Sequence, residues 1–154
     1  MFKQMRRQKR ELDISLAKDI LKKCEYGTLS TISDNGYPYN ITLSYVYYKD
    51  CIYFHSAKEG HKIDNIRNNN KVCFSVVGNT QVLQERFSTK YESVVVFGKA
   101  YEIDNNEKEL VLLKLVEKYS PNFIEEGKIY ISKAKDVTNV IKINIEHITG
   151  KAIY

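Results

Sequence analysis

The chain has 154 residues, 43% hydrophobic and 28% charged, a balance that excludes a disordered or fibrous protein and favours one domain over residues 1–154. The net charge of +5 matches the five basic residues before residue 11, so we expect a solvated basic tail over residues 1–12 and no nucleic-acid surface. The chain has three cysteines and no C-x-x-C pair, which disfavours a disulfide framework and a zinc knuckle. It has no apolar run near the ~18 residues of a membrane span, which disfavours a membrane protein. Together these features indicate a cytoplasmic protein.

The first elements predicted along the chain are a helix and a hairpin. Residues 15–24 place leucine and isoleucine side chains on one face, as in a short amphipathic helix. Residues 26–33 are typical of a strand, because tyrosine, threonine and isoleucine favour extended backbone. Asn35 and Gly36 accept the positive φ values of a tight turn, so the strand is expected to reverse there.

The second strand of the hairpin, residues 39–47, has the most regular pattern in the sequence. Apolar and polar side chains alternate along it, so one face should pack in the core while the other carries a polar row. The apolar positions are Tyr39, Ile41, Leu43, Tyr45 and Tyr47, and the polar ones are Asn40, Thr42 and Ser44. Residues 51–55 then predict a third strand.

A helix is predicted directly after that third strand. Ser56 and Glu59 have the S-x-x-E spacing of a capping box, and Ile63 and Ile66 follow at helical spacing. We therefore expect this helix to begin at Ser56 and to end in the three asparagines at 68–70.

The rest of the chain predicts three strands and one longer helix. The strands are expected at 71–78, 91–103 and 139–151, where β-branched residues are dense. The helix is expected over 106–119, with Pro121 as its stop. This order of elements predicts a small, mostly antiparallel β-barrel with helices at its edges.

The segment HSAKEGHK, residues 55–62, is the strongest candidate for a site. A strand that leads into a helix start leaves backbone N–H groups free at the positive end of the helix dipole, and such an end binds anions. Gly60 would let a ligand approach the backbone closely, and His61 and Lys62 could donate charge-assisted hydrogen bonds to a phosphate. A capped helix that binds nothing is an equally physical interpretation of these residues.

Other site chemistries lack their sequence patterns. His55, His61 and His147 do not have the i, i+4 spacing of a zinc-binding helix, so we expect no metal site. The chain contains no G-x-S-x-G, G-x-G-x-x-G or Walker sequence. A hydrolase, a Rossmann dinucleotide site and a P-loop therefore have no support.

Five separate segments of the chain form an ordered set of motifs. They are CEYGTLST (24–31), DNGYPYNITLSYVY (34–47), IYFHSAKEGHKIDNI (52–66), YESVVVFGKA (91–100) and IEHITGK (145–151). In that order they resemble the pyridoxamine 5′-phosphate oxidase-like flavoproteins, in particular the branch that contains the nitroimidazole-resistance proteins. The resemblance implies a mainly β fold, an antiparallel, Greek-key-like split β-barrel with a few flanking helices. It also implies a homodimer that binds FMN in clefts between its subunits.

The resemblance also indicates which residues would surround the flavin. One strand segment would run beside the isoalloxazine ring, and it comprises Tyr39, Asn40, Ile41 and Thr42. The residues that would lie near the ring or the phosphate, or on a strand that approaches the cleft, are His55, Ser56, Ala57, Gly60, His61, Lys62 and Ser93. Relatives often have arginine where this chain has His61, so the phosphate contacts differ here.

By the same resemblance, the function would be that of an FMN-dependent oxidoreductase acting on a small electrophile, with nitroaromatic compounds as candidate substrates. The flavin would carry the chemistry, and no side chain is assigned as catalytic. The R-x-H pattern of the full oxidase is missing, so oxidation of pyridoxamine phosphate is not expected. The alternative is a non-catalytic flavin or haem protein, a carrier or sensor, with His55 or His147 as an axial ligand.

Overall fold

The computed structural model describes residues 1–154, except for the side chain of Asn105. The strands are β1 (Glu11–Leu12), β2 (Tyr26–Ile32), β3 (Pro38–Ser44), β4 (Val46–Tyr48), β5 (Cys51–Ala57), β6 (Lys71–Leu83), β7 (Ser88–Ile103) and β8 (Thr138–Ile153). The α-helices are α1 (Ile14–Lys23), α2 (His61–Asn68), α3 (Asn105–Tyr119) and α4 (Ile124–Ala134).

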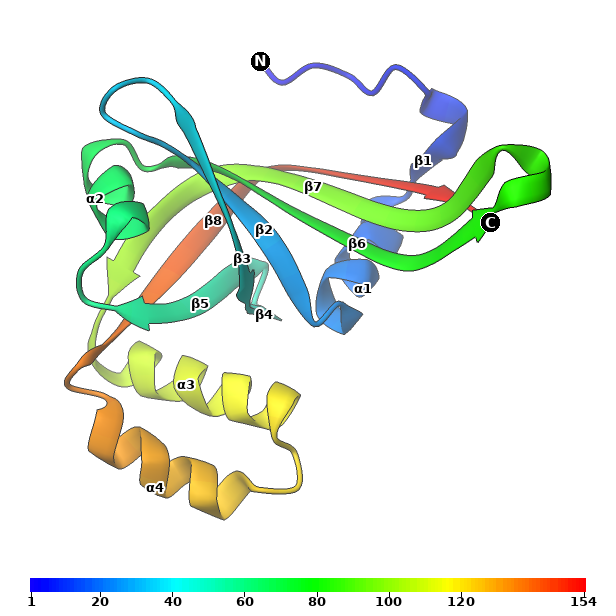
Figure 1. Ribbon diagram of the computed structural model, residues 1–154. Helices are drawn as coiled ribbons and strands as arrows, with labels where there is room; N and C mark the ends of the chain where they lie inside the picture. The colour runs from blue at the N-terminus through cyan, green and yellow to red at the C-terminus, as the bar shows by residue number, and fades with distance from the viewer.

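All eight strands belong to one antiparallel sheet. Its order is β3-β2-β6-β7-β8-β5-β4, with β1 paired to β8. Figure 1 shows the sheet curving into a barrel, with α2 beside it, α3 and α4 below it, and the β6–β7 hairpin reaching out as an arm. The prediction of a mostly antiparallel split barrel with flanking helices is confirmed.

The two edge strands of this sheet, β3 and β4, are consecutive in the chain. Only Tyr45 separates them, so the chain leaves one edge of the sheet and enters the opposite edge at this residue. The sheet must curve until these edges meet, and chain continuity at Tyr45 closes the barrel. The single strand predicted over 39–47 is therefore two strands.

Side chains of α3 satisfy the backbone of Tyr45, which lies outside both strand ladders. The Tyr45 N–H donates to the Tyr119 hydroxyl at 2.9 Å, and the Tyr45 carbonyl accepts from Lys118 Nζ at 2.9 Å. Lys118 also donates to the Cys24 carbonyl at 2.7 Å, and the buried Tyr45 hydroxyl donates to the Leu21 carbonyl at 2.6 Å. Helix α3 thus ties the closure point of the barrel to the end of α1.

Apolar side chains from every long strand fill the barrel. Leu29, Phe54, Phe74 and Ile143 are fully buried there, together with the inner face of α1. Gly27 is needed at its position, because a Cβ atom would lie only 2.3 Å from the Phe74 ring. A second, smaller apolar cluster joins α3 to the outer side of β4, β5 and β8.

The prediction that a helix begins at Ser56 is wrong. Strand β5 continues to Ala57, because Ser56 pairs with Asn139 and Ala57 with Thr138 of β8. The Ser56 hydroxyl donates to the Ala57 carbonyl at 2.7 Å, so it does not cap a helix. Helix α2 begins only after Gly60, whose φ of 142° suits glycine. The predicted helix end at 68–70 is confirmed.

Two further features were not predicted. Helix α4 packs against α3, where Gly127 lies so close to Val116 that a Cβ would be 2.4 Å from its side chain. The basic tail is partly ordered against the barrel, since Phe2 stacks on the His147 ring at 4.8 Å and β1 pairs with β8. Among the described residues, no helix is both long and apolar enough to cross a bilayer.

Candidate functional site

Helix α2 starts beside the first residues of strand β3. The ring of His61, the first residue of α2, lies against the ring of Tyr39, with 4.0 Å between their centroids. On its other side, His61 Nε2 lies 2.9 Å from the Ser33 hydroxyl. No atom lies within 4 Å of the position that a Cβ of Gly60 would occupy, so the backbone is open to an incoming group there.

The start of α2 presents several hydrogen-bond donors. The N–H groups of Ile63 and Asp64 both donate to the Gly60 carbonyl at 3.0 Å. In the part of the chain that the structure describes, the N–H groups of His61 and Lys62 have no acceptor, and the Lys62 ammonium forms no ion pair. These groups lie at the positive end of the helix dipole, which is an arrangement that favours a phosphate.

His55 lies close enough to this helix start to sense its charge. Desolvation by the surrounding protein lowers the pKa of His55, and repulsion from the Lys62 ammonium lowers it further. Both effects favour the neutral imidazole. Along β5 the side chains alternate, so His55 points to one side of the strand and Ser56 to the other.

The four consecutive residues predicted to lie beside the isoalloxazine ring have their side chains on both faces of β3. Tyr39 and Ile41 are half-buried on the inner face, and Asn40 and Thr42 are exposed on the outer face. The Asn40 side-chain amide oxygen, Oδ1, accepts from the Ser30 hydroxyl at 2.5 Å. Because β3 is an edge strand, the backbone groups on its free side have no strand partner and remain available to a ligand.

Ser93 lies apart from these residues. It is on β7, between Val77 of β6 and Lys151 of β8, and strands β2 and β6 separate it from β3. Within one chain, the start of β3 therefore lies at the same end of the barrel as His55, Gly60, His61 and Lys62. Ser56 and Ala57 lie on the strand that leads to this end. Ser93 lies elsewhere, on the outer face of the sheet.

Three buried polar residues behind His61 were not predicted from the sequence. They are Thr31, Ser33 and Asn65, and each exposes 6% of its surface or less. Asn65 Nδ2 donates to Thr31 Oγ1 at 2.9 Å and to Ser33 Oγ at 3.4 Å. A signal was present in the sequence, because Thr31 and Ser33 occupy inward positions of a strand and Asn65 lies on the apolar side of a helix.

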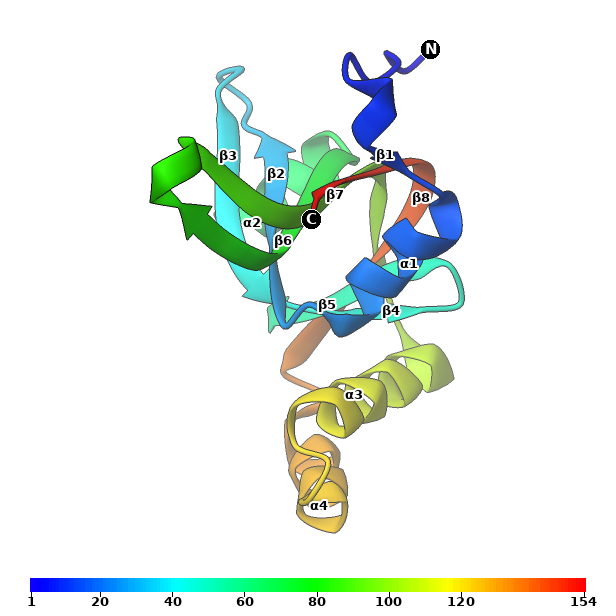
Figure 2. The same ribbon diagram turned by 90° about the vertical axis from the view of Figure 1, so that its right-hand side faces the viewer.

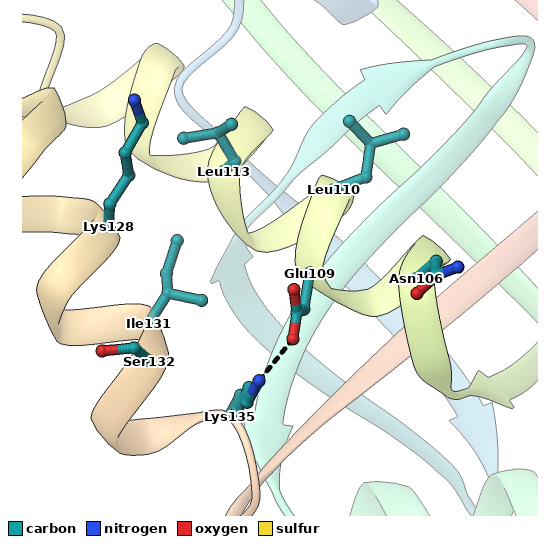
Figure 3. A pocket seen from close by; sticks show the side chains of 8 residues that line it. All are labelled: Asn106, Glu109, Leu110, Leu113, Lys128, Ile131, Ser132 and Lys135. Atoms are coloured by element: carbon teal, nitrogen blue, oxygen red, sulfur yellow. Dashed lines mark hydrogen bonds and ion pairs between the residues drawn. The ribbon is translucent and has the colours of Figure 1, made fainter.

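An alternative concavity is the groove of about 430 Å³ between α3 and α4. Leucine and isoleucine side chains line it, and an ion pair of Glu109 with Lys135 at 2.5 Å crosses one end (Figure 3). Figures 1 and 2 both place α3 and α4 below the barrel, whereas α2 lies at its side. None of the residues predicted to hold a flavin lines this groove, so we assign the candidate site to the start of α2.

A family model described as pyridoxamine 5′-phosphate oxidase matches residues 15–152. The chain belongs to the pyridoxamine 5′-phosphate oxidase family. The matched range includes β3, β5 and α2, so the candidate site lies entirely within the family domain. No protein with a curated description matches the chain.

Several solved structures share this fold of the pyridoxamine 5′-phosphate oxidase family. A candidate 5-nitroimidazole antibiotic resistance protein from Bacteroides thetaiotaomicron is 22% identical with a TM-score of 0.74, covering 92% of this chain and 86% of its own. An FAD-binding protein from Mesorhizobium loti is 23% identical with a TM-score of 0.68, covering 94% and 98%. The FAD and haem binding protein from Mycobacterium smegmatis is 17% identical with a TM-score of 0.81, covering 93% and 73%.

Proposed function

We propose that this protein binds FMN in a cleft between two copies of the chain and uses it to reduce small electrophiles, with nitroaromatic compounds as candidate substrates. The observation that carries the proposal is the start of α2 in a member of this family. Backbone N–H groups and a Lys62 ammonium that have no partner among the described residues lie there with the His61 ring, beside an aromatic side chain.

The residues at this helix start fit the two chemical parts of FMN. The Lys62 ammonium and the helix N–H groups suit a dianionic phosphate. Tyr39, Ile41 and the unpaired edge of β3 suit a flat ring system that carries hydrogen-bonding groups along one side. When bound, the flavin supplies the transfer of hydride or electrons. The chain's own groups bind it, orient it and limit the access of water.

A second copy of the chain would complete the cleft. The outer face of the sheet around Ser93 exposes the large apolar side chains Tyr26, Val77 and Phe97, which retain 62%, 59% and 38% of their surface. Apolar side chains gathered on one sheet face are typical of an association surface. We expect sedimentation to give about twice the chain mass of 18.0 kDa. A monomer that still binds FMN tightly would contradict the shared cleft.

The test begins with the purified full chain and its visible spectrum. We expect flavin bands, and release of the cofactor followed by mass spectrometry should identify FMN rather than FAD. Under anaerobic conditions NADH or NADPH should bleach the bands, and a nitroimidazole should restore them. A chain that takes up no flavin on reconstitution would refute the proposal. Flavin that is never reduced would leave only the binding function.

A non-catalytic flavin or haem protein is the second candidate. The similarity to the FAD and haem binding protein favours it, because that protein binds both cofactors on a related barrel. An axial ligand would have to come from His55 or from His147, whose ring is stacked against Phe2. A Soret band after addition of haem, lost in one histidine variant, would support this function. We expect none.

A further inference from the structure

The three buried polar residues behind His61 form a chain of hydrogen bonds with a direction. A side-chain amide nitrogen has two hydrogens, and Asn65 Nδ2 has two acceptors, Thr31 Oγ1 at 2.9 Å and Ser33 Oγ at 3.4 Å. Both hydrogens of Asn65 are therefore used. Each hydroxyl oxygen receives one of them and must place its own hydrogen on another acceptor.

Each of the two hydroxyl groups has one candidate acceptor within hydrogen-bond distance among the described residues. Thr31 Oγ1 lies 3.5 Å from the Tyr39 carbonyl, to which it donates. Ser33 Oγ lies 2.9 Å from His61 Nε2, and no other acceptor for this hydroxyl is found among the described residues. With Asn65 Nδ2 as the donor to Ser33 Oγ, Nε2 is the acceptor left for the Ser33 hydrogen. A ring nitrogen that accepts a hydrogen bond carries no proton.

We propose that Asn65, acting through Ser33, is a positioning residue that holds His61 as the neutral tautomer with its proton on Nδ1. Asn65 does not touch the imidazole ring. It determines the direction of the hydrogen bond that the ring receives, and the Tyr39 ring at 4.0 Å limits rotation of the imidazole. The N–H at Nδ1 has no acceptor in the part of the chain that the structure describes.

The consequence for ligand binding rests on the proposed function. A proton on Nδ1 makes the free ring nitrogen a donor, which attracts a phosphate oxygen. The opposite tautomer would present a lone pair at the same place and repel the anion. Because the two tautomers differ in the sign of this interaction, the buried Asn65 affects affinity for a phosphate that it does not contact.

The tautomer can be measured without any ligand. Long-range ¹H–¹⁵N spectra of the full chain separate a protonated from an unprotonated ring nitrogen, and at about pH 8.5 an ordinary histidine is neutral. We expect the His61 proton on Nδ1. His55 and His147 provide internal references. A proton found mainly on Nε2 would mean that the hydrogen bonds run in the opposite direction, and would overturn the assignment.

Two variants test the proposed cause. In Ser33→Ala the ring loses the donor to Nε2, so its proton should move towards Nε2, the form that free imidazole side chains favour in water. In Asn65→Asp a carboxylate would accept from both hydroxyl groups and reverse the chain, with the same result. If Asn65→Asp does not fold, Ser33→Ala decides. An unchanged tautomer in Ser33→Ala would overturn the role of the network.

A matched control exists for each variant. Ser30→Ala removes a hydroxyl from the outer face of β2, three residues before Ser33, where it bonds to Asn40. Asn68→Asp places the same new charge at the exposed end of α2. Neither should change the His61 tautomer. A change in Ser30→Ala equal to that in Ser33→Ala would show that general disturbance of β2, and not the hydrogen bond, controls the ring.

Binding measurements connect the tautomer to the ligand. FMN affinity should fall about tenfold in Ser33→Ala, because one hydrogen bond to a charged group is lost, while riboflavin affinity should stay unchanged. If the tautomer changes but FMN affinity does not, the Nδ1 proton does not serve the phosphate and the positioning role is overturned. If FMN does not bind the wild type, the proposed function fails, whereas the spectra still decide the tautomer.

Discussion

Strand β3 has a polar network at each end, and the two networks differ in what they leave free. Just after the last residue of β3, the side chains of Lys118 and Tyr119 form hydrogen bonds with backbone groups, including both the N–H and the carbonyl of Tyr45. Near its first residue, the network ends at His61, whose second ring nitrogen has no partner among the described residues. A buried polar group that satisfies the backbone stabilises the fold, whereas one that orients a free donor prepares a binding site.

Replacing a tyrosine by alanine at each end of β3 should give the largest difference in the free energy of unfolding. Tyr45→Ala removes a fully buried ring that packs edge-on against Phe74 and should lower the free energy of unfolding by about 3–5 kcal/mol. Tyr39→Ala removes a half-buried ring and should cost about 1 kcal/mol or less while weakening FMN binding. Urea unfolding of the flavin-free proteins gives both values. Equal losses of stability would contradict the comparison.

At the binding end, Lys62→Ala should lower FMN affinity by about ten- to a hundredfold, because one charge-assisted hydrogen bond is worth ~1.5–3 kcal/mol. Riboflavin, which has no phosphate, should bind the wild type and the variant almost equally in a fluorescence titration. Lys58→Ala, an exposed lysine in the same connection, is the matched control and should change neither affinity. An unchanged FMN affinity in Lys62→Ala would place the charge elsewhere.

At the structural end, Tyr119→Phe should leave the Tyr45 N–H without an acceptor and lower the free energy of unfolding by about 1–3 kcal/mol. The control is Tyr130→Phe on α4, where the side chain is 73% exposed, and its effect should be within about 0.5 kcal/mol. Chemical unfolding at neutral pH measures both. If Tyr119→Phe is also neutral, water replaces the hydroxyl and the closure point is less protected than the contacts indicate.

The smallest effect should be a pH dependence that arises at the same end. Burial of the ammonium lowers the pKa of Lys118 from 10.5 to about 8. Between these values the unfolded chain binds a proton that the folded chain has released, so the free energy of unfolding rises with pH. Comparing wild type with Lys118→Met at about pH 7.5 and 9.5, below most tyrosine ionisation, should show the rise only in wild type. A parallel rise in both proteins would exclude Lys118 as its source.

Local patterns predicted the elements whose conformation depends on neighbours in sequence. Gly36, with a φ of 85°, forms the predicted turn, and the alternation that begins at Tyr39 gives β3 its two faces. The predictions were wrong where a residue far away in the sequence determines the local backbone conformation. Ser56 has a capping-box pattern, but pairing with Asn139 of β8 keeps it in a strand. The break at Tyr45 depends on side chains of α3 that accept from its N–H and donate to its carbonyl.

The candidate site was predictable only in its outer part. Gly60, His61 and Lys62 are adjacent in sequence, so their convergence at a helix start could be inferred even though the expected first residue of the helix was wrong. Asn65 and Ser33 are 32 positions apart, and only the folded barrel joins them. Polar residues at inward positions of a strand and a helix are the pattern that indicates such a network.

The place of β8 in the sheet has a consequence for synthesis of the protein. This strand lies between β7 and β5, yet 80 residues, 58–137, separate β5 from it in the chain. At a translation rate of about 5–20 residues/s, β5 waits about 4–16 s for its second neighbour. During that interval its free edge is exposed to other nascent chains. Barrel formation is therefore completed only after β8 has been synthesised, and chaperones that shield strand edges should raise the yield of folded protein.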